Sequence, residues 1–122
     1  MSSKLIQWQK YNRDNKPTVT LSNAIINHLR ANGHDAVKVH VIGLRGRRIA
    51  TASRGVADIV AVLKPNGKHL EIDVKIGRDK PSEYQMIRQE RVQEKGGLYW
   101  FIKCFTEFEQ LYNNIIRKEI YE

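Results

Sequence analysis

The chain has 122 residues, 41% of them hydrophobic, and its 21 Lys and Arg against 13 Asp and Glu give a formal net charge of +8. This composition is typical of one globular domain and too apolar for a disordered chain. No apolar run approaches the ~20 residues that span a bilayer, no secretory signal stands near residue 1, and the single Cys104 excludes an internal disulfide. We therefore expect a cytoplasmic protein, with no membrane partner, whose positive charge suits a polyanion such as nucleic acid.

The first predicted element is a helix in the stretch "TLSNAIINHLRANG". Its large apolar residues recur at i, i+4 and i+8, Thr20 can cap its start, and Gly33 stands where a glycine would end it. Residues 1–19 before it are expected to form an arm that packs on the body or on a partner, and the domain proper spans residues 20–122. The alternating stretch "AVKVHVIG" then predicts a half-buried strand.

A cluster of basic residues follows this strand. "LRGRRIATASRG" contains four arginines and no acidic residue, in a context of Gly and Ser that favours a loop. The cluster predicts contacts with nucleic-acid phosphates, and a solvated loop is the alternative. The residues concerned are Arg45, Arg47, Arg48 and Arg54.

The stretch "GVADIVAVLKPNGKHLEIDVK" predicts a β-hairpin. Asn66-Gly67 is a strong signal for a two-residue turn, and a turn centred there pairs Leu63 with Leu70 and Asp58 with Lys75. Opposed residues share a face of the sheet. One face then collects Asp58, Val60, Val62, Glu71, Asp73 and Lys75, and the other is apolar, with Ala57, Ile59, Ala61, Leu63, Leu70, Ile72, Val74 and Ile76.

Three further elements complete the chain. Ser82 predicts the N-cap of a second helix from Glu83 to Lys95, with a thin apolar stripe of Tyr84, Met86, Ile87 and Val92. "LYWFIKCF" predicts a fourth strand, and "TEFEQLYNNIIRKEIY" an amphipathic last helix. The order of helix, three strands, helix, strand and helix predicts an α/β domain with a sheet flanked by helices.

The charged face of the hairpin suggests a chemistry. In the predicted register Asp58 and Asp73 are diagonal neighbours, roughly 7–8 Å apart at the backbone, close enough for their carboxylates to share a cation. Mg²⁺ or Mn²⁺ prefers such oxygen ligands and assists phosphodiester hydrolysis, in which Lys75 could stabilise the growing charge. The alternative is an exposed ladder of solvated charges.

"GVADIV", "EIDVK" and "PSEYQ", in this order and on these elements, resemble the PD-(D/E)xK nuclease superfamily, most closely its virus-type replication-repair nuclease (VRR-NUC) branch. The resemblance covers roughly residues 20 to 103. It implies a restriction-endonuclease-like αβββαβ core, a mixed sheet flanked by helices, to which this chain adds a C-terminal helix.

The resemblance also implies roles for individual residues. Asp58 and Asp73 would bind the metal together with the backbone carbonyl of Val74, and Lys75 would be the catalytic lysine. Gln85 would face the site from the second helix, unless Ser82-x-x-Gln85 serves as a capping box. Glu71 would bind a second cation or a metal-attached water, or else be a charge at the outer rim.

In one respect the chain departs from many superfamily members. They place an acidic residue on the first helix, where this chain offers Asn23, so one-metal and two-metal chemistry both stay open. The resemblance implies a homodimer that cuts branched DNA such as Holliday junctions. The apolar surface for dimerisation would come from the arm (Leu5, Ile6, Trp8, Tyr11) or the last helix (Phe108, Tyr112, Ile116, Ile120). The alternatives are a DNA-binding accessory domain without activity and a nuclease subunit active only beside a larger partner.

Overall fold

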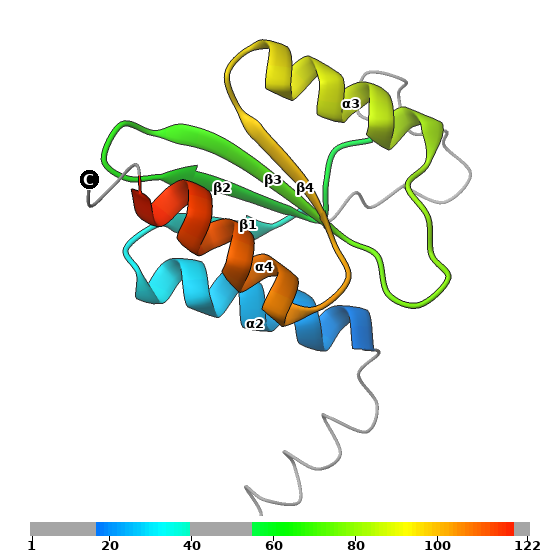
Figure 1. Ribbon diagram of the computed structural model, residues 1–122, viewed down its shortest axis with the longest axis horizontal. Coiled ribbons are helices and arrows are strands. Elements are labelled where there is room, and N and C mark those ends of the chain that lie inside the picture. Colours follow the sequence, from blue (N-terminus) through cyan, green and yellow to red (C-terminus); the bar gives the residue numbers. More distant parts are fainter. Residues whose placement is uncertain (1–16, 40–54, 119–122) are drawn as a thin grey trace, which may run out of the picture.

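The structure, a computed structural model, describes residues 17–39 and 55–118. The arginines expected to contact DNA and residues 1–16 of the expected arm lie outside these residues. Within them, a four-stranded sheet forms the middle layer, with α2 (Pro17–Ala31) and α4 (Phe105–Leu111) on one face and α3 (Glu83–Glu94) on the other (Figure 1). No helix in the described part of the chain is long and apolar enough to cross a membrane.

The first helix, α2, begins earlier than expected. It starts at Pro17, three residues before the predicted Thr20 cap, so residues 17–19 belong to the helix and not to an arm. Proline suits the first position of a helix because the amide it lacks would have no partner there. The predicted end is confirmed: Gly33 has φ +88°, and the chain turns so that His34 N donates to Leu29 O.

The sheet is mixed, as expected. Its strands are β1 (Asp35–Lys38), β2 (Ile59–Leu63), β3 (Lys68–Val74) and β4 (Leu98–Ile102), in the order β1-β2-β3-β4. The first two neighbouring pairs are antiparallel, and β3 and β4 are parallel because α3 connects them as a crossover helix. The element order predicted from the sequence is therefore confirmed.

The predicted register of the hairpin is wrong by two residues. Leu63 pairs with Lys68 and not with Leu70. The connection is a four-residue loop over residues 64–67, closed by a hydrogen bond from Gly67 N to Leu63 O (2.8 Å), and not the two-residue turn. Continuing the observed pairing by one residue places Asp58 opposite Asp73. Because side chains alternate with a period of two, the even shift leaves both on the face predicted for them.

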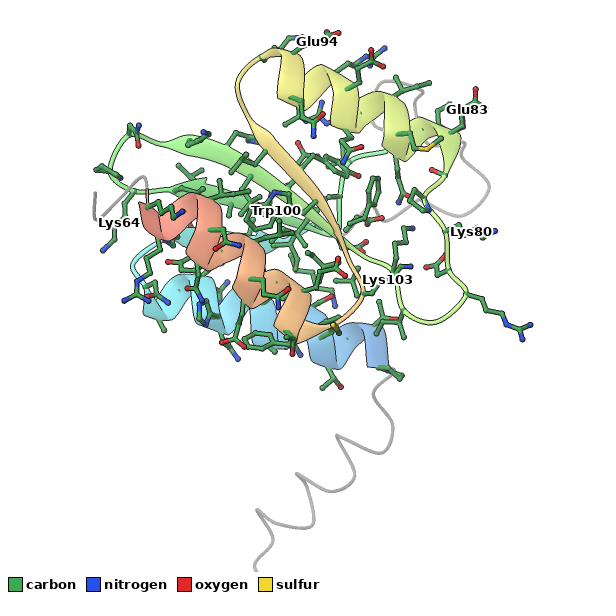
Figure 2. The ribbon with its side chains drawn as sticks, viewed as in Figure 1. Lys64, Lys80, Glu83, Glu94, Trp100 and Lys103 are labelled. Atoms are coloured by element: carbon green, nitrogen blue, oxygen red, sulfur yellow. The ribbon has the colours of Figure 1, made fainter. Side chains whose placement is uncertain are left out.

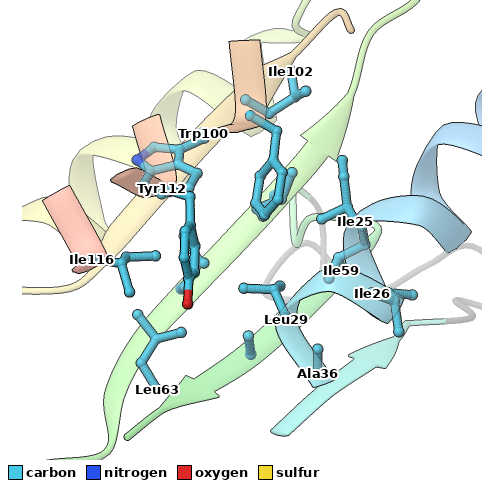
Figure 3. Packing of buried hydrophobic residues seen from close by; sticks show 14 of the residues in the cluster. Ile25, Ile26, Leu29, Ala36, Ile59, Leu63, Trp100, Ile102, Tyr112 and Ile116 are labelled. Carbon is cyan, nitrogen blue, oxygen red and sulfur yellow. The ribbon is translucent and has the colours of Figure 1, made fainter. Parts of the chain in front are cut away.

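The main core lies between the other face of the sheet and the layer of α2, α4 and η2, a π-helical turn over Tyr112–Arg117 (Figure 3). Ile25 and Leu29 of α2 and Ile59 and Ile72 of the hairpin are fully buried there. The last helix was expected to offer apolar surface to a second copy. That expectation is wrong for its described part, since its apolar side faces this core: Phe108, Tyr112 and Ile116 are at most 3% exposed.

A second, smaller cluster joins α3 to the opposite face of the sheet. It contains Ala57, Val92 and Tyr99, with Phe101 packed against it. Ala57 was predicted on the face of the main core, but it precedes β2, where the strict alternation of the strand does not yet apply. The apolar stripe predicted for α3 is mostly exposed, and only Val92 is buried; Tyr84, Met86 and Ile87 are 42–53% exposed.

Candidate active site

The hairpin brings the two aspartates together where β2 begins and β3 ends. Asp58 directly precedes β2, and Asp73 is the penultimate residue of β3. The backbone of Asp58 is held by Val39 N, which donates to its carbonyl (2.7 Å), and its side-chain Oδ2 accepts from Val74 N (3.3 Å). These contacts aim the Asp58 carboxylate at the end of β3.

Asp73 is a buried carboxylate whose charge is not fully compensated. It is 1% exposed, and its Oδ2 has no hydrogen-bond partner. The ammonium nitrogen of Lys75 lies 3.0 Å from this oxygen, so the two form an ion pair whose angles are not those of a hydrogen bond. An acceptor left without a donor in a buried position costs free energy, which a bound cation would offset.

The pKa of Asp73 reflects this environment. Burial, together with hydrogen bonding to the Asp58 carboxyl and the negative charge of Asp58, raises the pKa to about 6, although the nearby Lys75 lowers it in part. A divalent cation would stabilise this carboxylate, and the Asp58 carboxylate beside it, in place of a proton.

The carbonyl of Val74 is placed to join these carboxylates. Along β3, Lys75 N donates to Ile102 O of β4 (2.8 Å), whereas the preceding Val74 N donates to Asp58. The N–H and C=O of one residue in an extended strand point to the same side. The Val74 carbonyl therefore points toward Asp58, as its expected role requires.

Lys75 is nearly as buried as Asp73, at 9% exposed. Its Nζ lies 3.0 Å from Asp73 and 3.8 Å from Asp79, an exposed carboxylate in the loop after β3. Asp79 was not predicted as a site residue from the sequence, because the loop that contains it matches no motif. Its i, i+4 spacing from Lys75 was the available signal. Asp58, Asp73, Val74 and Lys75, four of the residues expected at the site, thus lie together.

Glu71 lies two residues before Asp73 and is occupied by other contacts. It is fully buried, so the outer-rim alternative is wrong. Arg88 of α3 donates to both of its oxygens (3.2 and 2.8 Å), Ala57 N donates to Oε1 (3.3 Å), and His69 contacts Oε2. Hydrogen bonds with Arg88 and His69 outweigh burial and lower the pKa of Glu71. Binding of a cation by Glu71, which stays a prediction, would have to compete with these contacts.

Arg88 was missed by sequence reasoning. It comes from a different element, and nothing in the local pattern of α3 distinguishes it from the neighbouring charged residues. The available signal was indirect, since a glutamate on a buried strand needs a cationic partner.

Gln85 forms the capping box. Its backbone N–H donates to Ser82 Oγ (3.2 Å), and its side-chain Oε1 accepts from Ser82 N (2.9 Å), as the sequence spacing allowed. This contact uses the side-chain oxygen at the start of α3. Its expected catalytic role stays a prediction.

The structure explains why glycine stands at position 55, in the "GVAD" stretch. Its φ is +86°, and a Cβ at this position would lie 2.2 Å from the carbonyl oxygen of Tyr84 in the first turn of α3. The Gly55 carbonyl accepts a hydrogen bond from the hydroxyl of Tyr99 (2.8 Å). The close approach that only glycine permits therefore fixes the segment leading to Asp58 between α3 and β4.

The donor set fits a hard divalent cation only if water completes it. Among residues 17–39 and 55–118, no group of three His, Cys, Asp or Glu side chains is arranged to hold a metal ion. Two carboxylates and one carbonyl suit Mg²⁺, which usually keeps several of its waters. A zinc centre, which needs three or four nitrogen, sulfur or oxygen ligands from side chains, does not fit the described residues.

The structure thus has a mixed sheet between two helical layers, with a carboxylate pair and a lysine at the end of its hairpin. A solved structure described as "VRR_NUC domain" is similar to this chain with a TM-score of 0.63 and 20% sequence identity, over 83% of this chain and 99% of that one. No protein-family model and no curated protein matches the chain. The chain thus has the α/β fold of a VRR_NUC domain.

Proposed function

We propose that this protein is a metal-dependent endonuclease that hydrolyses phosphodiester bonds in DNA. The observation that carries the proposal is the buried Asp73 oxygen without a hydrogen-bond partner, beside the Asp58 carboxyl and 3.0 Å from the Lys75 ammonium. Removing the Asp73 carboxylate from water, beside the half-buried Asp58, is unfavourable unless something compensates its charge. A divalent cation and the phosphate it attracts would provide that compensation.

In this proposal each residue has a separate task. Asp58, Asp73 and the Val74 carbonyl hold Mg²⁺ or Mn²⁺, which when bound neutralises phosphate charge and acidifies a neighbouring water. Lys75, held by Asp73, directs its ammonium group at the phosphate and stabilises the negative charge that grows during attack. Burial strengthens this interaction because little water screens it.

The test is cleavage of linear, flapped and four-way DNA by the purified protein in Mg²⁺, Mn²⁺ or EDTA. We expect cutting only with metal and none above background by Asp73→Asn, because loss of an essential ligand costs several kcal/mol of barrier. Lys75→Ala should still bind Mn²⁺, measured by calorimetry, and yet lose rate. Undiminished cutting by folded Asp73→Asn would refute the assignment.

For the substrate and the assembly, we propose branched DNA cut by a homodimer. A four-way junction has two-fold symmetry, so its resolution takes two matched nicks, and a two-fold dimer presents two sites in fixed relation. The support for a dimer is exposed apolar surface beside the site, on the first turns of α3, with Tyr84, Met86 and Ile87. Light scattering and symmetric paired cuts on a junction test it; a monomer that cuts linear and branched DNA equally would reject it.

The positive charge outside the described residues is proposed to hold the DNA backbone. Replacing Arg47 and Arg48 with Ala should weaken binding to all sequences alike and flatten its salt dependence by about 0.9 per lost phosphate contact. If the variant binds DNA with unchanged affinity and salt slope, these arginines do not contact DNA and belong to a solvated loop.

A second candidate is a DNA-binding accessory domain that does not cut DNA, or a nuclease subunit that cuts only beside a larger partner. It is favoured by the absence of a third ligating side chain in the described part of the chain. DNA binding without cleavage of any substrate in Mg²⁺ or Mn²⁺ would support it.

A further inference from the structure

A basic hollow of about 230 Å³ lies at the end of α3 farther from the two aspartates. Figure 2 labels both ends of this helix, Glu83 where it begins and Glu94 where it ends, and the lining residues come from its second half and the residues just after it. The hollow is lined by His69, Arg88, Arg91, Val92, Lys95 and Gly97. Four of these six residues are basic, and none is acidic.

The helix gathers these charges on one side. Arg88, Arg91, Val92 and the C-cap Lys95 are spaced i, i+3, i+4 and i+7, so they lie along one side of α3, whereas Glu90 lies on the opposite side and Glu94 at the border. Gly97 keeps the floor open, since a Cβ there would come within 2.7 Å of Val92 Cγ1.

The positive charge of the hollow is only partly compensated. Glu71 beneath it is fully buried, and it pairs with Arg88 and His69. The exposed side chains of Arg91 and Lys95 form no hydrogen bond or ion pair with any other residue in the described ranges. Two uncompensated cations beside a guanidinium that has further N–H groups to donate are suited to a phosphate group.

The hollow also lies in line with the aspartates. His69, Glu71 and Asp73 alternate along the same face of β3. The four residue steps from His69 to Asp73 cover roughly 13 Å at ~3.3 Å each. A DNA strand lying along β3 could therefore place one phosphate at the aspartates and another, a short way along the strand, at the hollow.

We propose that this basic hollow binds a second phosphate of the substrate strand, a few nucleotides from the phosphate at the proposed cation site of Asp58 and Asp73. The inference rests on the proposed nuclease function. It assigns Arg91 and Lys95 to strand positioning and adds a contact independent of the arginines at 45–54. The phosphate is either an internal one or the terminal phosphate of a strand end.

The test compares binding of Arg91→Ala/Lys95→Ala with that of a control variant, Arg117→Ala/Lys118→Ala. The control removes the same charge from η2, on the other side of the sheet. Affinity for labelled duplex DNA is measured in EDTA over a range of salt concentrations. We expect the first variant to bind severalfold more weakly and with a salt slope smaller by about 1 to 2, and the control to stay near the wild type.

Substituted DNA then locates the contact. A neutral methylphosphonate is moved along the strand one position at a time, with the cut site of the wild type as reference, and strand ends with and without phosphate form a separate arm. Substitution at one position, a few nucleotides from the cut, should weaken DNA binding by the wild type and leave binding by the variant unchanged. An effect of the terminal phosphate alone would identify a strand end as the ligand.

Two outcomes would overturn the inference in different ways. If the wild type and the Arg91/Lys95 variant bind DNA with equal affinity and salt slope, the hollow does not bind a phosphate, and the nuclease proposal stays intact. If the wild type does not bind DNA, both the phosphate-binding role of the hollow and the proposed nuclease function are refuted. Both replaced side chains are exposed, so thermal melts should confirm an intact fold.

Discussion

Replacing Asp73 by asparagine should abolish cleavage and, at the same time, stabilise the metal-free protein at neutral pH. The pKa of this buried carboxyl is about 6, against an ordinary value of 3.8. A raised pKa means that the folded state binds the proton more tightly than the unfolded state. The stability this proton provides is complete below pH 3.8 and is lost as the pH rises to about 6.

The magnitude follows from that interval. About two pH units at ~1.36 kcal/mol each give a loss of at most roughly 3 kcal/mol for the wild type above pH 6. Asparagine keeps the shape and carries no charge, so it avoids this loss. For a domain of this size we expect Asp73→Asn to melt roughly 5–10 °C higher than the wild type at pH 7.5 in EDTA. Below pH 3.8 the gain should vanish.

The assay is thermal melting of the two proteins in EDTA and in Mg²⁺. Magnesium should raise the melting temperature of the wild type but not that of Asp73→Asn, because only the wild type gains binding free energy. Asp79→Asn is the matched control: it also lies near Lys75, but its side chain is 58% exposed, and it should change little. A lower melting temperature for Asp73→Asn in EDTA at pH 7.5 would refute the reasoning, since it would mean that Lys75 compensates the buried charge.

Three other substitutions test the surroundings of the site. Arg88→Ala should lower the free energy of unfolding by ~3–5 kcal/mol in urea titrations, because it leaves Glu71 buried with less compensation, and an unchanged value would contradict the buried pair. Gly55→Ala should destabilise the fold and slow cleavage much more than Gly77→Ala, which has a positive φ but open space around it; equal effects would exclude the clash as the cause. Burial and the charge of Lys64 lower the pKa of His34, so the folded wild type resists protonation of His34 and loses stability as the pH falls below 6.5. His34→Gln should therefore lose less stability than the wild type between pH 7 and pH 5. Parallel curves of stability against pH for the two proteins would disprove this.

Local patterns were sufficient to predict most elements and both faces of the hairpin. The capping box at Ser82 and Gln85 is confirmed because it needs only residues three positions apart. Asp58 and Asp73 share a face in the structure although the predicted register is off by two, since a strand's period of two makes an even shift harmless to the faces. The start of α2 at Pro17 was missed because a polar run precedes it and Thr20 is an equally suitable N-cap residue.

The electrostatic state of the site was decided by tertiary structure. The sequence pattern of a strand with Glu71 and Asp73 on one face is the same whether that face is solvated or covered by a helix. Here α3 covers it and brings Arg88 to Glu71, while Asp73 is buried without a comparable partner. The sequence by itself therefore determined which residues share the face, because alternation along a strand is local. Only the packing of α3 decided which carboxylate is paired and which keeps an oxygen without a hydrogen-bond partner, because burial and partners depend on residues distant in the chain.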